Sequence, residues 1–549
     1  MTIPAPSVDR SRDCPTVCLG PDQQLAIADL EAIAQGAMRV EISTAAKKAT
    51  SASAGFLDAL IAEERCIYGV TTGYGPLANN HVDPRCSDAL QRNLVYHLAS
   101  GVGAPLCWAS ARAVVTCRLQ ALSQGLSAVS HSVLDLLALS LNTGLAPVIP
   151  EKGTVGASGD LTPLSHMALA LMGEGAWMDA KGLVSNAAAF ARMDTQPLAL
   201  GPKEGLALVN GTSAMTGIAG LNGAKMRRLL KQACLLSLMN AEVFQGHLSA
   251  WHPLVGAARG QPGQQAIHAL LWLLTGQGSR MQPFEATPAK LQGSGDVRHD
   301  QLLPQDPYSI RCVPQLLGAC LDMLETHDDV VGREMSAVTD NPLVFPQQST
   351  LIHAGNFFGQ HVAFAADALS NAAIMVAILL ERQIARVTDV QQSAGLPAFL
   401  QGRQTGLNSG FMGAQVTATA LVAEMRARGV PASIQSIPTN ANNQDVVTMG
   451  TIAARSASAI LADAGRIAAI HAMCMAQAVD LREAQSDKAG FSQVSLAMRD
   501  FVRTHTAFLG EDRPLSNEIE TLADAMALPG VFADIFADIA FAKDALAQF

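Results

Sequence analysis

Two long stretches with apolar positions at helical spacing constrain the fold of this chain most strongly. Residues 359–388 and 449–483 each run for about thirty residues, with apolar side chains three or four positions apart and no internal proline. A helix gains most of its stability by packing an apolar face against other elements. The two stretches therefore predict a bundle of long helices, and their length favours a bundle whose helices continue into neighbouring copies of the chain.

The composition favours helices over sheets. Apolar residues make up 49% of the 549 residues, whereas aromatic residues make up only 5%. Ala, Leu, Gly and Met fill most apolar positions and suit closely packed helices, whereas sheets favour aromatic and β-branched residues. We predict an all-α fold, with a long central helical bundle and a smaller, mixed, loop-rich N-terminal region that carries the functional site.

We expect four segments along the chain. Residues 1–20 predict a flexible tail, and residues 21–210 mix short helices with Gly-rich turns. Residues 211–484 predict the central long-helix bundle, and residues 485–549 return to short helices.

The charge and the cysteines narrow the class of protein. The formal net charge is −10 and no basic run is present, so we expect no nucleic-acid partner. The ten cysteines are scattered, which fits a reducing compartment and predicts no zinc site. Residues 1–15 lack the apolar core of a signal peptide, and the least charged stretch, residues 205–224, is too polar to cross a bilayer. We therefore expect a cytoplasmic protein with no membrane partner and no metal.

The most unusual local pattern is the Gly-rich loop of residues 153–166. Its second half predicts the start of a helix, with Thr162 as the N-cap and Pro163 at the first helical position. The Ala-Ser-Gly triplet of residues 157–159 would then lie just ahead of a helix N-terminus, where the helix dipole favours negative charge. Taken alone, the pattern is also consistent with an ordinary loop before a capped helix.

The motifs of this chain resemble those of the histidine, phenylalanine and tyrosine ammonia-lyases. Residues 154–166 are similar to the signature of that family, and the similarity covers most of residues 25–510. The other similar segments follow in the family's order: residues 68–78, 93–103, 207–217, 305–314, 337–342, 355–363, 407–424 and 431–454. One match of this kind would carry little weight, whereas the ordered set identifies a member of the family.

The resemblance implies a prosthetic group made from the chain itself. In the family, the residues that correspond to Ala157, Ser158 and Gly159 cyclise: the Gly nitrogen attacks the Ala carbonyl and two waters are lost. The product is a 4-methylidene-imidazol-5-one ring (MIO). The residue types suit this chemistry, because glycine offers an unhindered amide and permissive dihedrals, alanine adds little bulk, and serine supplies the hydroxyl that leaves. The resemblance implies no metal or nucleotide in addition.

The resemblance also implies roles for residues outside the loop. Tyr68 corresponds to the tyrosine that removes the substrate's β-proton; since a free phenol has a pKa of about 10, this role requires a positive or hydrogen-bonding environment. Tyr308 corresponds to a tyrosine that handles protons around the amine, and Arg311 to the arginine that grips the carboxylate with its planar guanidinium. Further positions that line the amino acid or the ring are Asn210, Gln305, Phe357, Asn440, Asn443 and Gln444. Apart from Gln305, these positions are equally compatible with packing behind the site.

His97 and Leu98 bear on the choice of substrate. In the family this pair reads Ser-His in histidine enzymes, Phe-Leu in phenylalanine enzymes and His-Leu in tyrosine enzymes. A neutral imidazole can hydrogen-bond a para-hydroxyl group, whereas Phe would leave that group unpaired. The resemblance therefore implies that L-tyrosine is converted to trans-4-coumarate and ammonia, with lesser activity on L-phenylalanine. Taken alone, His97 is equally an ordinary helix histidine bonded to the backbone.

Active sites in this family draw residues from three subunits, so the resemblance implies a homotetramer with shared active sites and a small aromatic amino acid as its ligand. Two alternatives stay open. A tyrosine 2,3-aminomutase uses the same group but returns the ammonia to the β-carbon, which gives β-tyrosine. A catalytically inactive helical scaffold would keep an uncyclised Ser158, although the joint presence of Tyr68, Ser158, Tyr308 and Arg311 argues against it.

Overall fold

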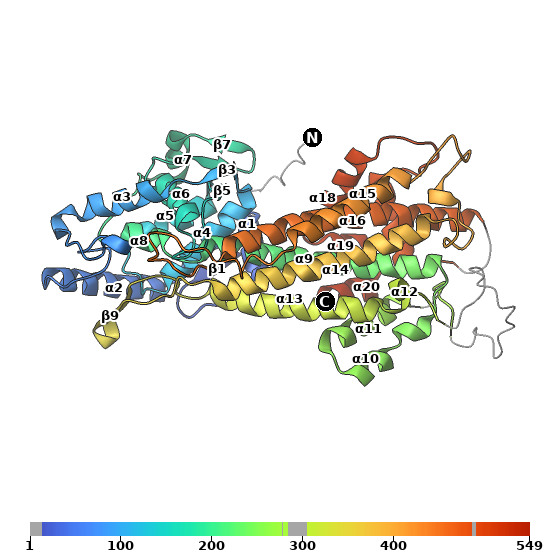
Figure 1. Ribbon diagram of the computed structural model, residues 1–549, viewed down its shortest axis with the longest axis horizontal. Coiled ribbons are helices and arrows are strands. Elements are labelled where there is room, and N and C mark those ends of the chain that lie inside the picture. Colours follow the sequence, from blue (N-terminus) through green and yellow to red (C-terminus); the bar gives the residue numbers. More distant parts are fainter. Residues whose placement is uncertain (1–13, 277, 284–304, 486–489) are drawn as a thin grey trace. The chain divides into compact units, whose positions relative to one another are not determined.

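The structure is a computed structural model that describes residues 14–276, 278–283, 305–485 and 490–549 (Figure 1). The fold is all-α, with a few short strands, as predicted. The two long apolar stretches form helices α14 (Gln360–Thr388) and α16 (Gly450–Ala484), within one residue of the predicted bounds. Neither helix contains an internal proline. Buried apolar side chains lie on more than one face of each helix, so each packs against neighbours on several sides and not along a single apolar stripe.

Contacts divide the chain into two units, each made from three separate stretches. Unit 1 comprises residues 1–224, 326–367 and 431–458, and unit 2 comprises residues 225–325, 368–430 and 459–549. Four long helices contribute residues to both units: α9 (Ser213–Val243), α13 (Val313–Met335), α14 and α16. Each unit has its own apolar core.

Helix α4 lies in the core of unit 1, and its residues from Ala111 to Ser123 are all buried, including Arg112 and Arg118, whose guanidinium groups donate to backbone carbonyls. Helix α4 contacts α1 and α5 most extensively. The helices of this unit, besides the long ones, are α1 (Ile27–Ala34), α2 (Thr44–Ala62), η1 (Gly75–Leu77), η2 (Pro84–Cys86), α3 (Ser87–Leu98), α4 (Trp108–Ser123), α5 (His131–Asn142), α6 (Leu161–Leu171), α7 (Asn186–Met193), α8 (Glu204–Val209) and η5 (Pro346–Gln348).

The short strands of the described residues all lie in unit 1. Residues 16–19, which the sequence assigned to a flexible tail, instead form β1 (Thr16–Leu19), which pairs in parallel with β2 (Arg39–Ile42). The side chain of Leu19 is buried, and this burial favours the ordered strand. Residues 1–13 of the predicted tail lie outside the described residues. The other strands pair antiparallel: β3 (Val102–Pro105) with β5 (Pro150–Lys152), β4 (Ala146–Pro147) with β6 (Trp177–Asp179), β6 with β7 (Gly182–Val184), and β8 (Leu343–Phe345) with β9 (Thr350–Ile352).

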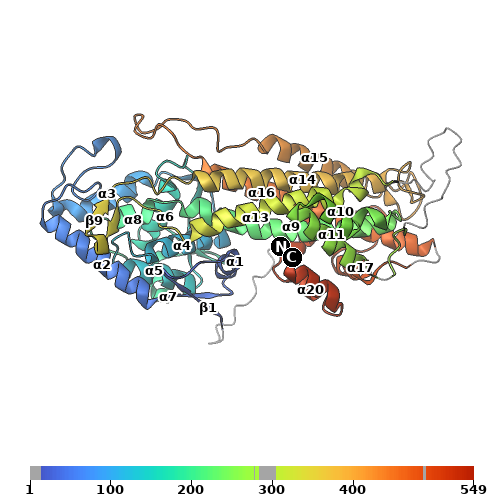
Figure 2. The same cartoon turned by 90° about the horizontal axis from the view of Figure 1, so that it is seen from below.

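Unit 2 consists of helices packed around parts of α9, α13, α14 and α16. Helices α9 and α14 lie side by side in both ribbon views, and the Gln383 side chain donates to Ser237 Oγ at 3.0 Å between them (Figures 1 and 2). The remaining helices of this unit are η3 (Leu248–Trp251), α10 (Pro253–Arg259), α11 (Pro262–Thr275), α12 (Tyr308–Arg311), η6 (Ala398–Leu400), α15 (Met412–Arg428), α17 (Gln493–His505), α18 (Ser516–Ala527), α19 (Val531–Ile535) and α20 (Ala540–Gln548).

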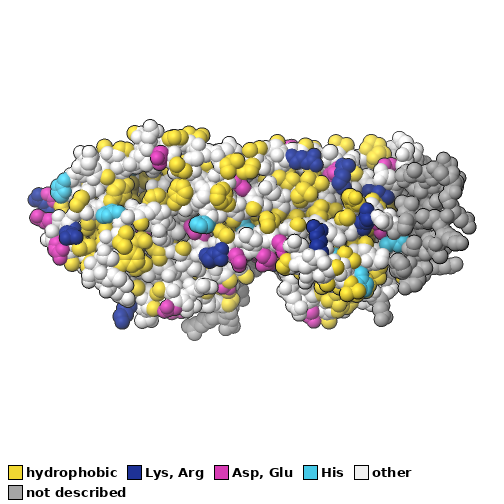
Figure 3. Space-filling view, turned by 60° about the horizontal axis from the view of Figure 1, so that its bottom comes forward, with side chains coloured by type: hydrophobic (Ala, Val, Ile, Leu, Met, Phe, Trp, Pro, Cys, Tyr) yellow, Lys and Arg dark blue, Asp and Glu magenta, His cyan; other side chains and the backbone are white. Residues whose placement is uncertain are grey.

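Helices α14 and α16 are long and apolar enough to cross a membrane by length and composition alone. Most residues of their apolar stretches are nevertheless buried inside the protein, as in the core helices of a helical bundle. Hydrophobic side chains also remain on the surface and are spread over much of the face drawn in Figure 3.

Candidate active site

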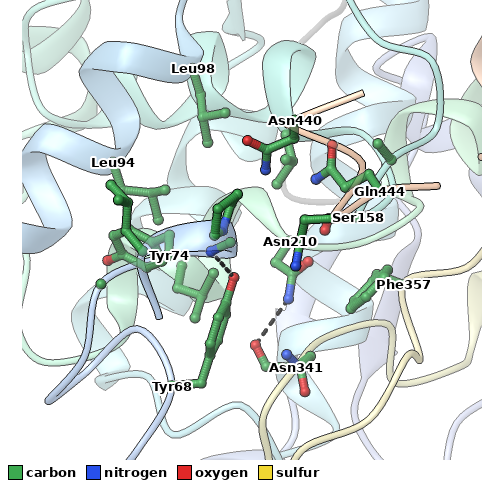
Figure 4. Close-up of a pocket in the computed structure, with 18 of the residues that line it drawn as sticks. Tyr68, Tyr74, Leu94, Leu98, Ser158, Asn210, Asn341, Phe357, Asn440 and Gln444 are labelled. Carbon is green, nitrogen blue, oxygen red and sulfur yellow. Dashed lines mark hydrogen bonds between the residues drawn. The ribbon is translucent and has the colours of Figure 1, made fainter. Parts of the chain in front are cut away.

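A cavity of about 1070 Å³ in unit 1 collects residues that are far apart in the sequence (Figure 4). The turn after residue 67 and helix α3 line it, as do segments near residues 158, 210, 341, 357 and 440. The predicted site residues that line this cavity are Tyr68, His97, Leu98, Ala157, Ser158, Asn210, Phe357, Asn440, Asn443 and Gln444. The fold therefore brings together most of the side chains that the sequence singled out.

The Ala-Ser-Gly triplet adopts a tightly folded backbone. Ser158 has a φ of 52° and Gly159 a φ of 74°, so two consecutive residues occupy the left-handed region, which serine rarely adopts. A Cβ atom at position 159 would collide with the carbonyl oxygen of Gly211. The Asp160 N–H donates to the same oxygen at 2.7 Å. The unhindered glycine and the folded turn fit the requirements of an MIO ring at these residues.

Helix α6 begins at Leu161, directly after the triplet, with Asp160 in the N-cap position and no side-chain cap. The expectation of Thr162 as the N-cap was therefore wrong by two residues, because Thr162 and Pro163 lie inside the first turn, where proline lacks only an N–H that would be unpaired anyway. The carboxylate of Asp160 instead accepts from the Thr451 hydroxyl and from the Met215 N–H at 2.8 Å. Burial raises the pKa of Asp160 to about 6, although these hydrogen bonds oppose the rise.

The turn that carries Tyr68 is fixed at both ends. The Tyr68 N–H donates to His353 Nε2 at 3.1 Å, and the Tyr68 phenolic oxygen accepts from the Gly75 N–H at 2.8 Å. The ring of Tyr74 meets the ring of Tyr68 edge-on, with centroids 6.2 Å apart. Burial and the neighbouring Tyr68 raise the pKa of Tyr74 well above its ordinary value. Tyr74 therefore stays protonated and serves as packing, with its hydroxyl donating to the Gly69 carbonyl at 3.3 Å.

His97 presents one ring nitrogen to its own helix. Its Nδ1 lies 3.0 Å from the carbonyl oxygen of Asn93, one turn earlier in α3. A carbonyl accepts only, so this contact assigns the proton to Nδ1 and leaves Nε2 of the neutral ring as an acceptor. His97 can therefore bond to its own helix through Nδ1 and still bind a substrate through Nε2, so the two interpretations of this residue are compatible.

Several buried polar residues behind the cavity were missed in the sequence. Gln91 on α3 donates to the Gly69 carbonyl at 2.8 Å and accepts from the Leu206 N–H at 2.9 Å, which ties the Tyr68 turn to α8. Lys203 and Asp340 form an ion pair at 2.6 Å whose side chains are fully buried. A lysine in a loop ordinarily lies at the surface, and nothing in its sequence neighbourhood indicates this burial.

Gln305, Tyr308 and Arg311 belong to unit 2 and do not line the cavity of unit 1. The Arg311 guanidinium carbon lies 4.7 Å from the centroid of the Tyr308 ring, on the short helix α12. The Tyr308 side chain is 71% exposed and Gln305 is also exposed. Tyr308 and Arg311 therefore lie close to one another within unit 2.

Comparison with known proteins agrees with this fold. Residues 25–504 match the family described as aromatic amino acid lyase, and the chain belongs to that family of carbon–nitrogen lyases. It is 46% identical to a tyrosine ammonia-lyase of Cereibacter sphaeroides, over 91% of this chain and 96% of the relative. It is also 40% identical to a histidine ammonia-lyase of Symbiobacterium thermophilum, over 91% and 94% of the two chains. A solved structure of a tyrosine aminomutase from Streptomyces globisporus is 36% identical and superposes with a TM-score of 0.88, over 95% of this chain and 99% of the other.

Proposed function

We propose that this enzyme converts L-tyrosine to trans-4-coumarate and ammonia, with lesser activity on L-phenylalanine. The observation that carries the proposal is the convergence of Ser158, Tyr68 and His97 on one cavity. Ser158 lies in the folded triplet, Tyr68 offers a phenolic oxygen, and His97 offers a neutral acceptor nitrogen. These are an electrophile precursor, a base and a binding group for a phenol.

The MIO group formed from Ala157, Ser158 and Gly159 would supply an electrophilic carbon that takes up the substrate's amine and makes it a good leaving group. Tyr68 would remove the β-proton. The Gly75 N–H that donates to its oxygen stabilises negative charge there, which a proton acceptor of this kind needs. The amide side chains of Asn440, Asn443 and Gln444 line the cavity as polar walls, and Phe357 supplies an aromatic wall.

The preference for tyrosine rests on His97. With Nδ1 bonded to Asn93, Nε2 is free to accept a hydrogen bond from the substrate's para-hydroxyl, and Leu98 adds an apolar side chain to the cavity lining. A phenylalanine at position 97 would leave that hydroxyl unpaired in an apolar end of the cavity, which costs about 1–3 kcal/mol. The similarity to a tyrosine ammonia-lyase supports the same substrate.

The residues that bind the substrate's carboxylate would come from another copy of the chain. Arg311 and Tyr308 lie outside the cavity lining, and in a homotetramer with shared active sites a neighbouring subunit would deliver them together with Gln305. Large apolar side chains exposed on each unit support extensive self-association. In unit 1 these include Phe364, Ile434 and Ile437, and in unit 2 Met375, Leu407 and Val416. We propose a cytoplasmic location, with no nucleic-acid or membrane partner and no metal.

Product analysis tests the proposal. Incubation with L-tyrosine should yield trans-4-coumarate, detected by its ultraviolet absorbance, and ammonium in equal amounts. A tyrosine 2,3-aminomutase is the second candidate, favoured by the similarity to the aminomutase structure. β-Tyrosine as the main product, without net ammonium release, would assign that activity instead. Turnover of L-histidine in preference to either aromatic substrate would overturn the choice of tyrosine.

A further inference from the structure

We infer that the hydroxyl group of Thr154 holds the loop of residues 154–159 in the folded turn from which the prosthetic group forms. Thr154 is thus a positioning residue for the cyclisation of Ala157, Ser158 and Gly159, and not a residue that contacts the substrate. The inference rests on the proposed function in one respect, namely that this triplet cyclises.

The Thr154 side chain bonds to the loop just before the triplet and again at its end. Its Oγ1 accepts a hydrogen bond from the Gly156 N–H at 3.1 Å and donates one to the Gly159 carbonyl oxygen at 3.2 Å. A hydroxyl group has a single hydrogen, which goes to Gly159, and a lone pair of the same oxygen serves Gly156. One side chain therefore joins the residue before the triplet to the last residue of the triplet.

The peptide group that joins Val155 to Gly156 is held at both ends. Its N–H donates to Thr154 Oγ1, and its carbonyl oxygen accepts from the Met449 N–H at 2.8 Å. Met449 directly precedes α16, and a Cβ atom on Gly156 would approach the Met449 nitrogen to 3.0 Å. Thr154 and the start of α16 therefore fix the entry to the triplet.

The peptide group that joins Gly159 to Asp160 is held in the same way. Its carbonyl oxygen accepts from Thr154 Oγ1, and its N–H donates to the Gly211 carbonyl oxygen at 2.7 Å. Two bonds on opposite edges of a planar peptide group leave that group little freedom to rotate. Thr154 thus bonds to both peptide groups that flank the triplet, and each of them has a second partner on another segment of unit 1.

Cyclisation requires the Gly159 nitrogen to meet the Ala157 carbonyl carbon. A nitrogen–carbon bond then forms, and the Ala157 oxygen leaves as water with one hydrogen from each of the Gly159 and Ser158 nitrogens. A second water takes the Ser158 hydroxyl and the hydrogen on its Cα. An amide nitrogen is a poor nucleophile, so the rate depends strongly on how often the two reacting atoms are in contact.

The folded turn needs support from its surroundings. Ser158 has a φ of 52°, which a serine keeps only where the surrounding structure enforces it. The two bonds of Thr154 span this turn and oppose its relaxation. Loss of the hydroxyl would free one end of each flanking peptide group and would lower the population of the reactive turn.

The position of Thr154 separates this role from catalysis. Ala157 and Ser158 line the cavity, whereas Thr154 does not. A substitution at Thr154 therefore changes the formation of the prosthetic group without removing a contact to the substrate. Once the ring has formed, covalent bonds keep the triplet folded. Variants should then differ in the fraction of matured chains, and not in the turnover of each matured site.

Intact mass spectrometry follows maturation independently of catalysis. Full-length chains are made by cell-free translation, translation is stopped, and samples are quenched in acid over time. We expect the loss of two waters to be slower in Thr154→Val by about tenfold to a hundredfold, as for the loss of two hydrogen bonds. Thr154→Ser keeps the hydroxyl and should mature like the wild type. Equal maturation of the wild type and Thr154→Val at every time would overturn the inference.

Thr143→Val is the matched control. Thr143 is also half-buried in unit 1, and its hydroxyl donates to the Leu139 carbonyl oxygen at 2.7 Å at the end of α5. It should mature like the wild type. Turnover of the preferred amino acid, divided by the fraction of matured chains, should be equal in all of these proteins. A fully matured Thr154→Val with lower turnover would overturn the inference, because the hydroxyl would then act in catalysis.

The same measurement distinguishes failure of the inference from failure of the proposed function. A wild type that keeps its full mass would overturn both, whereas equal maturation of the wild type and Thr154→Val would overturn the inference alone. A crystal structure of Ser158→Ala, which lacks the leaving hydroxyl, gives the answer where Thr154→Val does not fold. In that structure Thr154 Oγ1 must lie within hydrogen-bond distance of the Gly156 nitrogen and the Gly159 oxygen, and loss of either contact would overturn the inference.

Discussion

The phenolic oxygen of Tyr68 accepts a hydrogen bond from the backbone N–H of Gly75 at 2.8 Å, across a turn of the same chain. Gly75 has a φ of 52°, and a Cβ atom there would approach Asn440 Nδ2 to 2.7 Å. The glycine is thus required both for the turn and for the close approach of a second cavity segment. The proposed base is oriented by backbone, which is less mobile than a side-chain partner.

Removing this hydroxyl tests the role of Tyr68 directly. We expect Tyr68→Phe to lower kcat by about 10²- to 10⁴-fold, the usual contribution of a general base, with a smaller change in KM. Steady-state kinetics and the melting temperature are the measurements. Tyr96→Phe is the matched control, because the Tyr96 hydroxyl donates to Glu174 on the exposed surface. Equal losses in the two variants would exclude a specific role for Tyr68.

Intact mass spectrometry tests the self-made prosthetic group. The purified wild type should be lighter than its sequence by two waters, with the loss mapped to residues 157–159 and absent from Ser158→Ala. We expect Gly159→Ala to block the loss as well, because the added Cβ would collide with the Gly211 carbonyl. Gly55→Ala adds a Cβ with no atom within 4 Å and should keep the full loss. A wild type with the unmodified mass would contradict the proposed chemistry.

The His97 side chain should set the choice between tyrosine and phenylalanine. We expect His97→Phe to shift the ratio of kcat/KM values toward phenylalanine by at least about tenfold, because the acceptor for the para-hydroxyl is lost. Competition between the two amino acids, followed by chromatography of coumarate and cinnamate, measures the ratio. His131→Phe, on the exposed start of α5, is the control. An unchanged ratio in His97→Phe would remove the basis for naming tyrosine.

Much of the fold follows from local sequence, because apolar spacing reports burial wherever a helix is long. Helices α14 and α16 were predicted within one residue at each end for this reason. The strand at residues 16–19 was missed, since its stability comes from pairing with residues 39–42 and not from its own pattern. The division into two units was also not predictable from the sequence, because each unit joins three stretches that alternate along the chain with stretches of the other unit.

The site residues that line the cavity were found because short motifs carry them, but their supports were not. Asn210 stands in a recognisable motif, whereas Lys203 and Asp340 lie 137 positions apart and meet only in the folded chain. Gln91 likewise looks like a surface residue of α3 until its amide is seen between Gly69 and Leu206. Burial of a polar side chain depends on distant segments, and the sequence of one chain does not encode it locally.

The buried carboxyl of Asp160 predicts a pH dependence of stability. Its pKa is raised from 3.8 to about 6, so the folded state holds the proton more strongly than the unfolded state between these values. The contribution of this group to the free energy of unfolding is then largest below pH 3.8 and is lost as the pH rises to about 6. Relative to Asp160→Asn, we expect wild-type stability to fall by up to about 3 kcal/mol over this window and to stay constant above it. Urea denaturation of both proteins across the window measures the difference, and parallel curves would contradict the raised pKa.

Mixing two inactive variants tests whether active sites are shared between copies of the chain. Tyr68 lines the cavity of unit 1, whereas Arg311 lies on α12 of unit 2, outside that lining. We expect Tyr68→Phe and Arg311→Ala each to be nearly inactive alone. If a site takes Tyr68 from one subunit and Arg311 from another, random co-assembly restores intact sites, up to about a quarter of the wild-type activity. Co-expression with two affinity tags isolates the hybrids, and ammonium release measures their activity. Mixtures of the separately purified and stably assembled variants provide the control and should stay inactive. Hybrids without activity would mean that both residues must come from one chain, and the proposal of shared sites would fail.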